Sequence, residues 1–166
     1  MKILLLSNTN NRENGYGNLT HNLCVELQKK GIDITLLLPK EEPRQDYVNY
    51  KVEYILPPYI FDLKTKKIFN YLSFSYTTDA DIVHSITEFP YAVLAARIAR
   101  KNKKPLIIQS AGTYGVKPLL HFPEKIFLKW AYAQARFITP ISLFTAHMIK
   151  KFSGKKKLNI LAVYGG

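Results

Sequence analysis

A short loop rich in glycine and asparagine carries the residues whose chemistry is easiest to foresee. Gly15 and Gly17 flank Tyr16, and Asn18 follows them, just before a helical pattern of leucines that ends at Gly31. Glycine has no side chain, so backbone N–H groups of such a loop approach a ligand closely. Beside the amino end of a helix, these N–H groups favour an anion. The pattern therefore predicts that Gly15 and Gly17 bind a phosphate.

Two known types of nucleotide-binding loop fit this sequence poorly, whereas a purely structural turn remains an alternative. A dinucleotide fingerprint fits badly, because the loop lacks a third glycine and the next apolar run ends at residues 38–40 in Leu-Pro-Lys, without a carboxylate. A Walker nucleotide site is disfavoured, since no Gly-Lys-Ser/Thr follows the loop. A purely structural role, in which Gly15 and Gly17 only permit a turn, stays open.

The elements that would position this loop alternate along the chain. Apolar runs predict strands at residues 2–7, 32–38, 51–56, 81–84, 106–109, 137–139 and 158–163. Helical spacings predict helices at 19–30, 62–76, 90–104, 123–136 and 142–152, with loops at 8–17 and 110–120. On the third of these helices, one apolar face is expected to contain Tyr91, Leu94, Ala95 and Ile98. Such alternation indicates an α/β, Rossmann-like three-layer domain with a parallel sheet and helices on both faces.

Further polar residues are predicted to gather at the edge of the sheet where the glycine loop lies. Tyr16, Asn18, His84, Thr113 and Tyr114 all lie in loops or at strand ends. The carboxyl ends of parallel strands share one edge, and sheets of this type bind ligands there. His84 has an alternative role, because a histidine that closes a strand is more often a hydrogen-bonded core residue than a ligand contact.

The other reactive side chains predict no metal site and no catalytic nucleophile. The four histidines, at positions 21, 84, 121 and 147, are widely spaced, and none has another ligand at i+4. Cys24 is the single cysteine and lies within a helical pattern, so we expect a small buried apolar group. The chain also lacks the Gly-x-Ser-x-Gly pattern of a nucleophile elbow.

Composition places the chain among folded globular proteins. It has 166 residues, of which 47% are apolar. No apolar run approaches the ~20 residues that span a membrane. The apolar run that follows Met1 and Lys2 is too short for a signal peptide. We therefore expect a cytoplasmic protein.

The net positive charge comes entirely from the second part of the chain. Residues 1–60 contain seven Lys/Arg and seven Asp/Glu, whereas residues 61–166 contain seventeen and five, which accounts for the net charge of +12. Such a surface attracts polyanions, and nucleic acid, anionic lipid and phosphorylated substrates are the candidates. Lysines that only keep the protein soluble are the alternative.

One predicted helix concentrates this charge. Lys125, Lys129, Tyr132 and Arg136 follow i, i+4, i+7, i+11 spacing and form a cationic stripe, beside an apolar stripe assigned mostly to the core: Ile126, Trp130, Ala133 and Phe137. Other basic residues add to the cationic surface: Lys64, Lys66, Lys67 and Lys117. This surface suits a domain that rests on an anionic bilayer, which predicts peripheral binding to the inner membrane face.

In order along the chain, five segments resemble the amino-terminal domain of the retaining GT-B glycosyltransferases. This large family includes sucrose synthases and many bacterial and archaeal sugar transferases for lipid or polysaccharide acceptors. The segments are the glycine loop and helix at 15–27, the Asp-x-Val-His strand at 81–85, the stretch 105–114, the strand and helix start at 138–145, and residues 159–166. Each is weak alone, but their order covers nearly the whole chain.

The resemblance implies an enzyme that moves a sugar from a nucleotide sugar to a lipid-linked or saccharide acceptor with retention, without a required metal or a cofactor. It implies donor-phosphate contacts by Gly15 and Gly17. The implied acceptor contacts are Tyr16, Asn18, His84, Gly112, Thr113 and Tyr114. Ala111 departs from the pattern, because many members have a histidine there that points at the acceptor, and this puts acceptor handling by that side chain in doubt.

Domain boundaries also follow from the resemblance. Residues 1–163 match the acceptor-side domain, and residues 164–166 match the start of the linker to a carboxy-terminal domain that binds the donor. We therefore expect this chain alone to be inactive. Two alternatives remain: a single-domain basic α/β protein that binds nucleic acid or phosphate ligands, and a catalytically inactive interaction fragment. No nucleic-acid-binding motif is recognisable, so we expect no nucleic acid partner.

Overall fold

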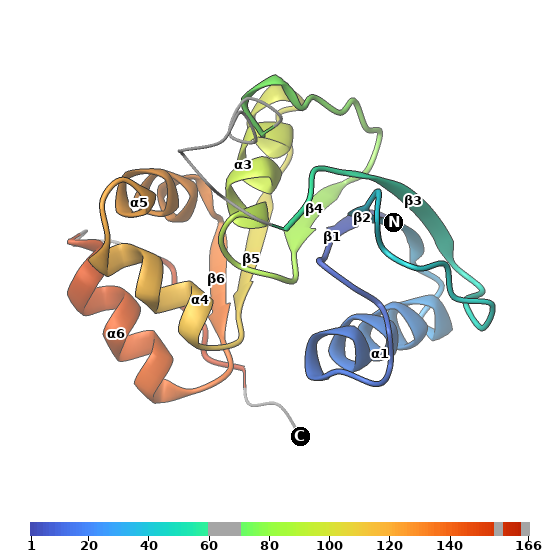
Figure 1. Ribbon diagram of the computed structural model, residues 1–166, viewed down its shortest axis with the longest axis horizontal. Coiled ribbons are helices and arrows are strands. Elements are labelled where there is room, and N and C mark those ends of the chain that lie inside the picture. The colour runs from blue at the N-terminus through green and yellow to red at the C-terminus, as the bar shows by residue number, and fades with distance from the viewer. Residues whose placement is uncertain (60–70, 155–157, 164–166) are drawn as a thin grey trace.

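Six strands form one parallel sheet, in the order β3-β2-β1-β4-β5-β6 (Figure 1). The computed structural model describes residues 1–59, 71–154 and 158–163. Within these ranges the strands are β1 (Lys2–Leu6), β2 (Asp33–Pro39), β3 (Lys51–Leu56), β4 (Ile82–Ser85), β5 (Leu106–Ser110) and β6 (Phe137–Pro140). The order reverses between β1 and β4, because the chain builds one half of the sheet outward from β1 and then returns to build the other half. The predicted α/β fold is confirmed.

Helices cover both faces of this sheet. They are α1 (Gly15–Lys29), α3 (Tyr91–Lys101), α4 (Thr113–Val116), the 3-10 helix η1 (Lys117–Leu120), α5 (Glu124–Gln134) and α6 (Leu143–Ser153). Side chains of β1 alternate between the two layers, as a strand requires. Ile3 and Leu5 belong to a cluster with Cys24 of α1, whereas Leu4 and Leu6 belong to the cluster that contains α3 and α5.

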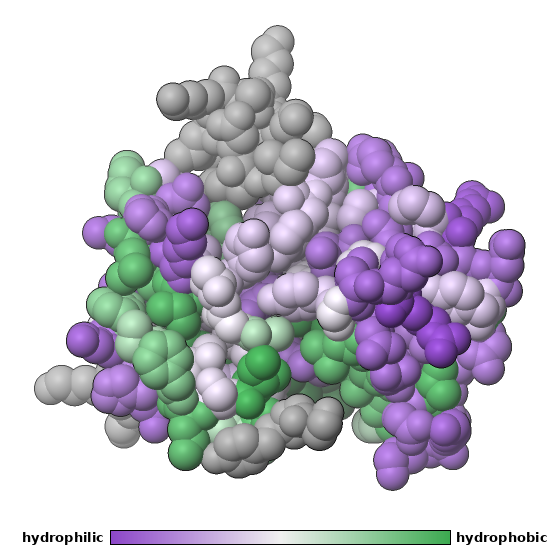
Figure 2. Space-filling view, turned by 60° about the horizontal axis from the view of Figure 1, so that its bottom comes forward, coloured by the Kyte–Doolittle hydropathy of each residue, from purple (hydrophilic) through white to green (hydrophobic). Residues whose placement is uncertain are grey.

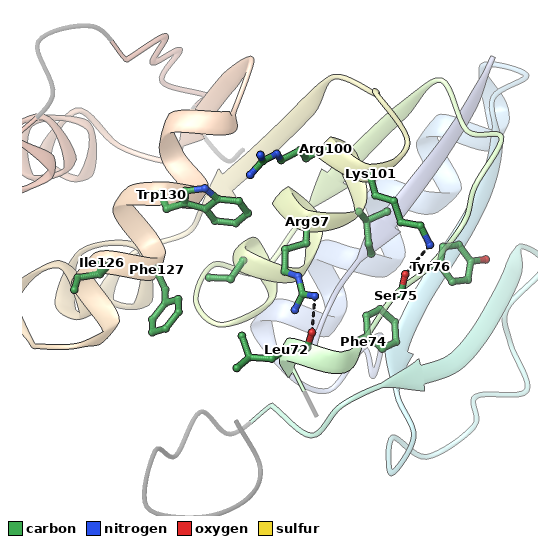
Figure 3. A pocket seen from close by; sticks show the side chains of 12 residues that line it. Leu72, Phe74, Ser75, Tyr76, Arg97, Arg100, Lys101, Ile126, Phe127 and Trp130 are labelled. Carbon is green, nitrogen blue, oxygen red and sulfur yellow. Dashed lines mark hydrogen bonds between the residues drawn. The ribbon is translucent and has the colours of Figure 1, made fainter. Parts of the chain in front are cut away.

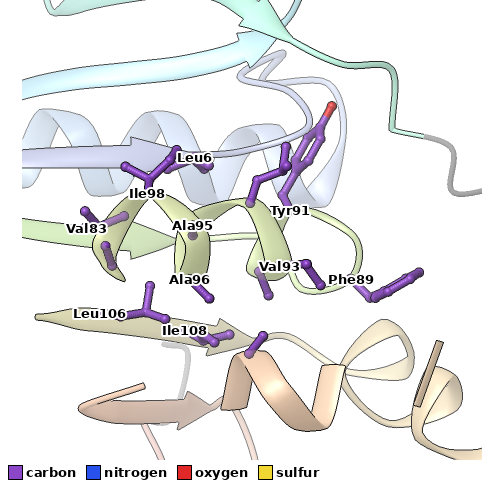
Figure 4. Packing of buried hydrophobic residues seen from close by; sticks show 14 of the residues in the cluster. Leu6, Val83, Phe89, Tyr91, Val93, Ala95, Ala96, Ile98, Leu106 and Ile108 are labelled. Carbon is purple, nitrogen blue, oxygen red and sulfur yellow. The ribbon is translucent and has the colours of Figure 1, made fainter. Parts of the chain in front are cut away.

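Small residues bring α3 close to the sheet. Its alanines at positions 92, 95, 96 and 99 are all buried. Figure 4 shows Ala96 of α3 directed toward Ile108 of β5, and both belong to one buried cluster. The predicted apolar face of this helix is therefore confirmed. So is the burial of Cys24, which raises the pKa of its thiol to about 12 and keeps it protonated.

Three predicted helix boundaries are wrong. Loop 8–17 ends early, because α1 begins at Gly15 after the Asn14 side chain caps it. Loop 110–120 contains α4 and η1. The helix predicted at 123–136 ends at Gln134, since Ala135 turns to extended backbone and the Arg136 N–H donates to the carbonyl of Leu106 at the sheet. Most of the helix predicted at 62–76 lies outside the described residues, although 74–76 are not helical.

The last predicted strand, residues 158–163, is also wrong as a strand of the sheet. Only an isolated parallel bridge joins Ile160 to Ile138. Backbone hydrogen bonds link the segment to β6 at alternate positions, and Leu161 and Val163 remain exposed. The apolar run predicted a strand, but the segment lies at the edge of the sheet beside the terminal strand β6 and forms only a short bridge with it.

Candidate functional site

The carboxyl edge of the sheet between β1 and β4 is the place where the strand order reverses. In open α/β sheets such a reversal leaves a crevice, because the loops after the two central strands diverge. Three segments meet here: the start of α1, the loop after β4 and the loop after β5. Their contacts define the candidate site.

Glu88 is the centre of the site, and sequence reasoning missed it. Its side chain is fully buried. Oε2 accepts a hydrogen bond from the Tyr16 hydroxyl at 2.7 Å, and Oε1 accepts one from the Gly112 N–H at 3.0 Å. The Ala111 N–H also donates to this carboxylate. One acidic side chain thus joins segments that are far apart in the sequence.

Burial dominates the electrostatics of Glu88. Desolvation raises the pKa of its carboxyl above the ordinary value, although the hydrogen bonds from Tyr16, Ala111 and Gly112 favour the ionised form. Burial, followed by the charge of Glu88, raises the pKa of the Tyr16 phenol, which therefore stays a hydrogen-bond donor. The sequence offered one signal, a carboxyl group just before the helix predicted at 90–104, but that position alone did not indicate that Glu88 is buried.

The two glycines of the predicted phosphate loop have different surroundings. A Cβ added at Gly17 would lie 1.9 Å from the carbonyl oxygen of Asn11, and its N–H donates to Asn14 Oδ1 at 2.7 Å. Gly17 therefore serves close packing of the loop against α1. Gly15 is exposed, and nothing lies within 4 Å of its Cβ position. In the described part of the chain, the N–H groups of Gly15 and Tyr16 have no hydrogen-bond partner.

Gly112 has a conformation that only glycine adopts readily. Its φ of 144° and ψ of −120° turn the N–H toward Glu88. Thr113 and Tyr114 then start α4 and are exposed. The ring of Tyr114 lies 6.4 Å from the ring of Tyr59 and lines a cavity of about 250 Å³ with Phe89 and other residues: Pro90, Lys117, Pro118, His121 and Glu124.

The other predicted acceptor residues contribute less to this cluster. Asn18 is exposed on α1, and its Oδ1 accepts from Asn22. His84 lies opposite Leu5 of β1 and is half-buried, but its Nε2 is shielded from solvent and has no partner among the described residues. Desolvation lowers the pKa of His84 to about 4, so the ring is neutral. Within the described ranges we find no hydrogen bond between His84 and Glu88.

The basic stripe predicted on one helix is interrupted in the structure. Lys125 and Arg136 are exposed, but Tyr132 is buried and donates to the carbonyl of Gly115, because this side of α5 faces the core. Arg136 lies beyond the end of α5, so helical spacing does not align it with Lys125. Lys129 is half-buried, and Lys117 is exposed. Lys64, Lys66 and Lys67 lie outside the described residues.

The apolar stripe is not core either. Ile126 and Phe137 are 54% and 41% exposed, and Trp130 and Ala133 are half-buried. The buried face of α5 consists of Leu128, Ala131 and Tyr132 instead. Figure 2 shows that hydrophobic residues gather on the side of α5 and α6, whereas the side of α1 and β3 is mostly hydrophilic. The predicted helical spacing was correct, but it did not show which face of α5 packs against the core.

The described residues offer neither a metal site nor a membrane-spanning helix. Across residues 1–59, 71–154 and 158–163, no group of three or more His, Cys, Asp or Glu residues is arranged to hold a metal ion. In the same ranges, every helix is too short or too polar to cross a membrane.

Comparison with known proteins adds the family relationship. The sequence model of a family described as Glycosyltransferase Family 4 matches residues 13–166. Comparison with the curated proteins finds no match. Among solved structures, the chain is similar to UGT73P12 of Glycyrrhiza uralensis, complexed with glycyrrhetinic acid 3-O-monoglucuronide. That match has 10% identity and a TM-score of 0.49, and it covers 98% of this chain and 48% of the other.

Proposed function

The chain belongs to glycosyltransferase family 4, and from this premise we propose that it is the acceptor-side half of a retaining glycosyltransferase. Its donor would be a nucleotide sugar, which is a substrate and not a resident cofactor. Its acceptor would be a lipid-linked or saccharide hydroxyl. Residues 1–163 form the acceptor-side domain in this proposal, and residues 164–166 begin the linker to a donor-binding domain.

The junction at Glu88 is the observation that carries the proposal. Tyr16, Glu88 and Gly112 tie three loops together at the edge where this class of sheet binds ligands. A transferase must hold two substrates in register, and fixed loops reduce the entropy lost when they bind. Asn18, Thr113 and Tyr114 are exposed and follow Tyr16 or Gly112 within two positions of the sequence, and in this proposal their side chains contact the acceptor.

The reaction would need charge stabilisation more than a protein nucleophile. The acceptor hydroxyl attacks the anomeric carbon on the face from which the diphosphate leaves, and the leaving phosphate oxygen takes the hydroxyl proton. Negative charge grows on that phosphate as the bond to the sugar breaks. The N–H groups of Gly15 and Tyr16 at the start of α1 would stabilise it, because they have no partner among the described residues.

A membrane-bound acceptor fits the second half of the molecule. Lys117, Lys125 and Arg136 are exposed there, together with apolar side chains that include Leu120, Phe122, Leu143 and Phe144. Basic residues near an acidic leaflet contribute about 1 kcal/mol each. We therefore propose that the protein is cytoplasmic and binds the inner membrane face peripherally, without a nucleic acid partner.

The function is tested with two proteins, residues 1–166 and the full product of the same reading frame. Each is incubated with labelled nucleotide sugars and a membrane lipid extract, and NMR determines the anomeric configuration of any product. We expect retention by the full product, no transfer by residues 1–166, and no sub-micromolar binding of a nucleotide sugar to residues 1–166 in calorimetry. An inverted product would contradict the mechanism, and tight donor binding by residues 1–166 would contradict the division into two domains.

A further inference from the structure

A groove on the outer face of the helical layer lies apart from the carboxyl edge. It has a volume of about 670 Å³, within the range of ~300–1,000 Å³ that small-molecule sites occupy. Figure 3 shows α5 on one side of the groove, the segment 72–76 on the other, and α3 between them. The residues that line it are mainly apolar or basic: Leu72, Phe74, Ser75, Tyr76, Val93, Arg97, Ile98, Arg100, Lys101, Ile126, Phe127 and Trp130.

The apolar walls explain the stripe on α5 that the core leaves uncovered. Ile126 and Trp130 are one helical turn apart and both line the groove, and Figure 3 shows the Trp130 ring directed toward α3. Opposite them, Leu72 and Phe74 supply the second wall, and Leu72 is 48% exposed. Apolar surface of this kind, rimmed by polar groups, marks a binding site more often than isolated exposed residues do.

Two cations of the groove have neutral hydrogen-bond partners in the described part of the chain. Arg97 donates to the backbone carbonyls of Tyr71 and Leu72. Lys101 Nζ donates to the hydroxyl of Ser75 at 2.7 Å. No carboxylate lines the groove, and neither these cations nor Arg100 form an ion pair within the described residues. Among the described residues, three positive charges therefore lie beside the apolar walls without a counter-charge.

Together, the apolar walls and the cations favour a ligand with an apolar chain and an anionic head. We propose that the groove binds the acyl chain of an anionic phospholipid, with the phosphate near Arg100 and Lys101. A second copy of this chain is a poor occupant, because a two-fold contact through the groove would bring identical cations together. The site is distinct from the acceptor edge, and the proposal does not rest on the proposed function.

The sole tryptophan of the sequence, Trp130, reports on the groove directly. Its fluorescence is followed while residues 1–166 are titrated with 1-oleoyl-lysophosphatidic acid below the aggregation concentration of that lipid. We expect a saturable shift to shorter wavelength, because the acyl chain removes water from the indole. Inorganic phosphate and neutral monooleoylglycerol are titrated in parallel and should bind at least about tenfold more weakly.

Charge variants separate the groove from general basicity. Arg100→Gln combined with Lys101→Gln removes two groove cations at the end of α3. Lys150→Gln combined with Lys151→Gln removes two exposed cations at the end of α6, which matches the first pair in charge and helix position. We expect the first double variant to bind lysophosphatidic acid about tenfold or more weakly, and the second to bind it like the unaltered chain.

A wall variant tests the apolar part. Ile126→Glu places a carboxylate in the groove, whereas Leu161→Glu changes a comparably exposed residue beside β6 that lies outside both the groove and the proposed membrane-binding surface. Only the first should abolish the fluorescence shift, with unchanged far-UV circular dichroism in both. The proposal is overturned by an unchanged Trp130 spectrum, by equal affinity for monooleoylglycerol, or by equal loss in the two charge variants.

Discussion

Two glutamates each accept a hydrogen bond from a tyrosine hydroxyl, but the pKa values of their carboxyl groups shift in opposite directions. Glu88 at the carboxyl edge is buried, and burial raises the pKa of its carboxyl. Glu53 on β3 accepts from Tyr76 at 2.9 Å, but its side chain is 26% exposed and pairs with Lys51 at 2.6 Å, which lowers its pKa. The tyrosine contact is similar, so burial and the lysine decide the difference.

This comparison indicates which of the two glutamates has more than a structural role. A surface pair such as Glu53 with Lys51 contributes little to stability and costs little. The carboxyl group of Glu88 is instead buried, which costs desolvation free energy, and it joins three segments at the edge where such sheets bind ligands. Positions of that kind are candidates for function.

The largest expected effect comes from the glycine that supplies a donor to Glu88. Gly112→Ala forces a side chain into a backbone region with φ of 144° and disturbs the N–H directed at the carboxylate. We expect a loss of about 3 kcal/mol in the free energy of unfolding, measured by urea denaturation. Gly31→Ala is the control, because Gly31 also has a positive φ but follows the end of α1 and does not contact Glu88. Gly31, with φ of 72°, lies in the left-handed region, which costs alanine about 1–2 kcal/mol, so a loss at Gly112 no larger than the loss at Gly31 would contradict the prediction.

A smaller effect follows from neutralising each glutamate. The amide of Glu88→Gln has one oxygen instead of two, so either the Tyr16 hydroxyl or the backbone N–H groups lose an acceptor. At neutral pH this should lower the free energy of unfolding by about 1–3 kcal/mol. The matched variant Glu53→Gln should lower it by less than about 1 kcal/mol, because water replaces the lost contacts. The comparison fails if Glu53→Gln is the more damaging change in urea denaturation.

The smallest effect is a difference in the sign of the pH dependence. With a raised folded-state pKa, Glu88 contributes most below the ordinary carboxyl pKa, and the contribution falls as pH rises through the raised value. With a lowered pKa, Glu53 contributes above the ordinary value and loses this contribution as pH falls. The stability gap between the unaltered chain and Glu88→Gln should therefore shrink with rising pH, and the gap for Glu53→Gln should grow.

Urea denaturation between about pH 3 and pH 8 measures both gaps. His84 titrates in this range, with a pKa of about 4, but it is present in all three proteins and cancels in the differences. Gaps that change in the same direction would contradict the assigned electrostatics.

Sequence alone determined the layers of this protein. Apolar runs predicted the six strands of the sheet within about two residues, and the helical spacing of apolar residues predicted a buried face of α3. These features are local, because the period of a strand or helix is written in neighbouring residues. The order of short motifs also indicated the family relationship, and the match of the family model over residues 13–166 confirms it.

Tertiary structure alone decided which side chains meet. Tyr16 and Glu88 are 72 positions apart, and Gly112 lies 24 positions from Glu88, so no local pattern joins them. Periodicity also showed that Ile126 and Trp130 share a face, but it did not show that this face borders a groove. The physical reason is that a helix face has the same spacing whether another element, a ligand or water covers it, and only packing distinguishes these cases.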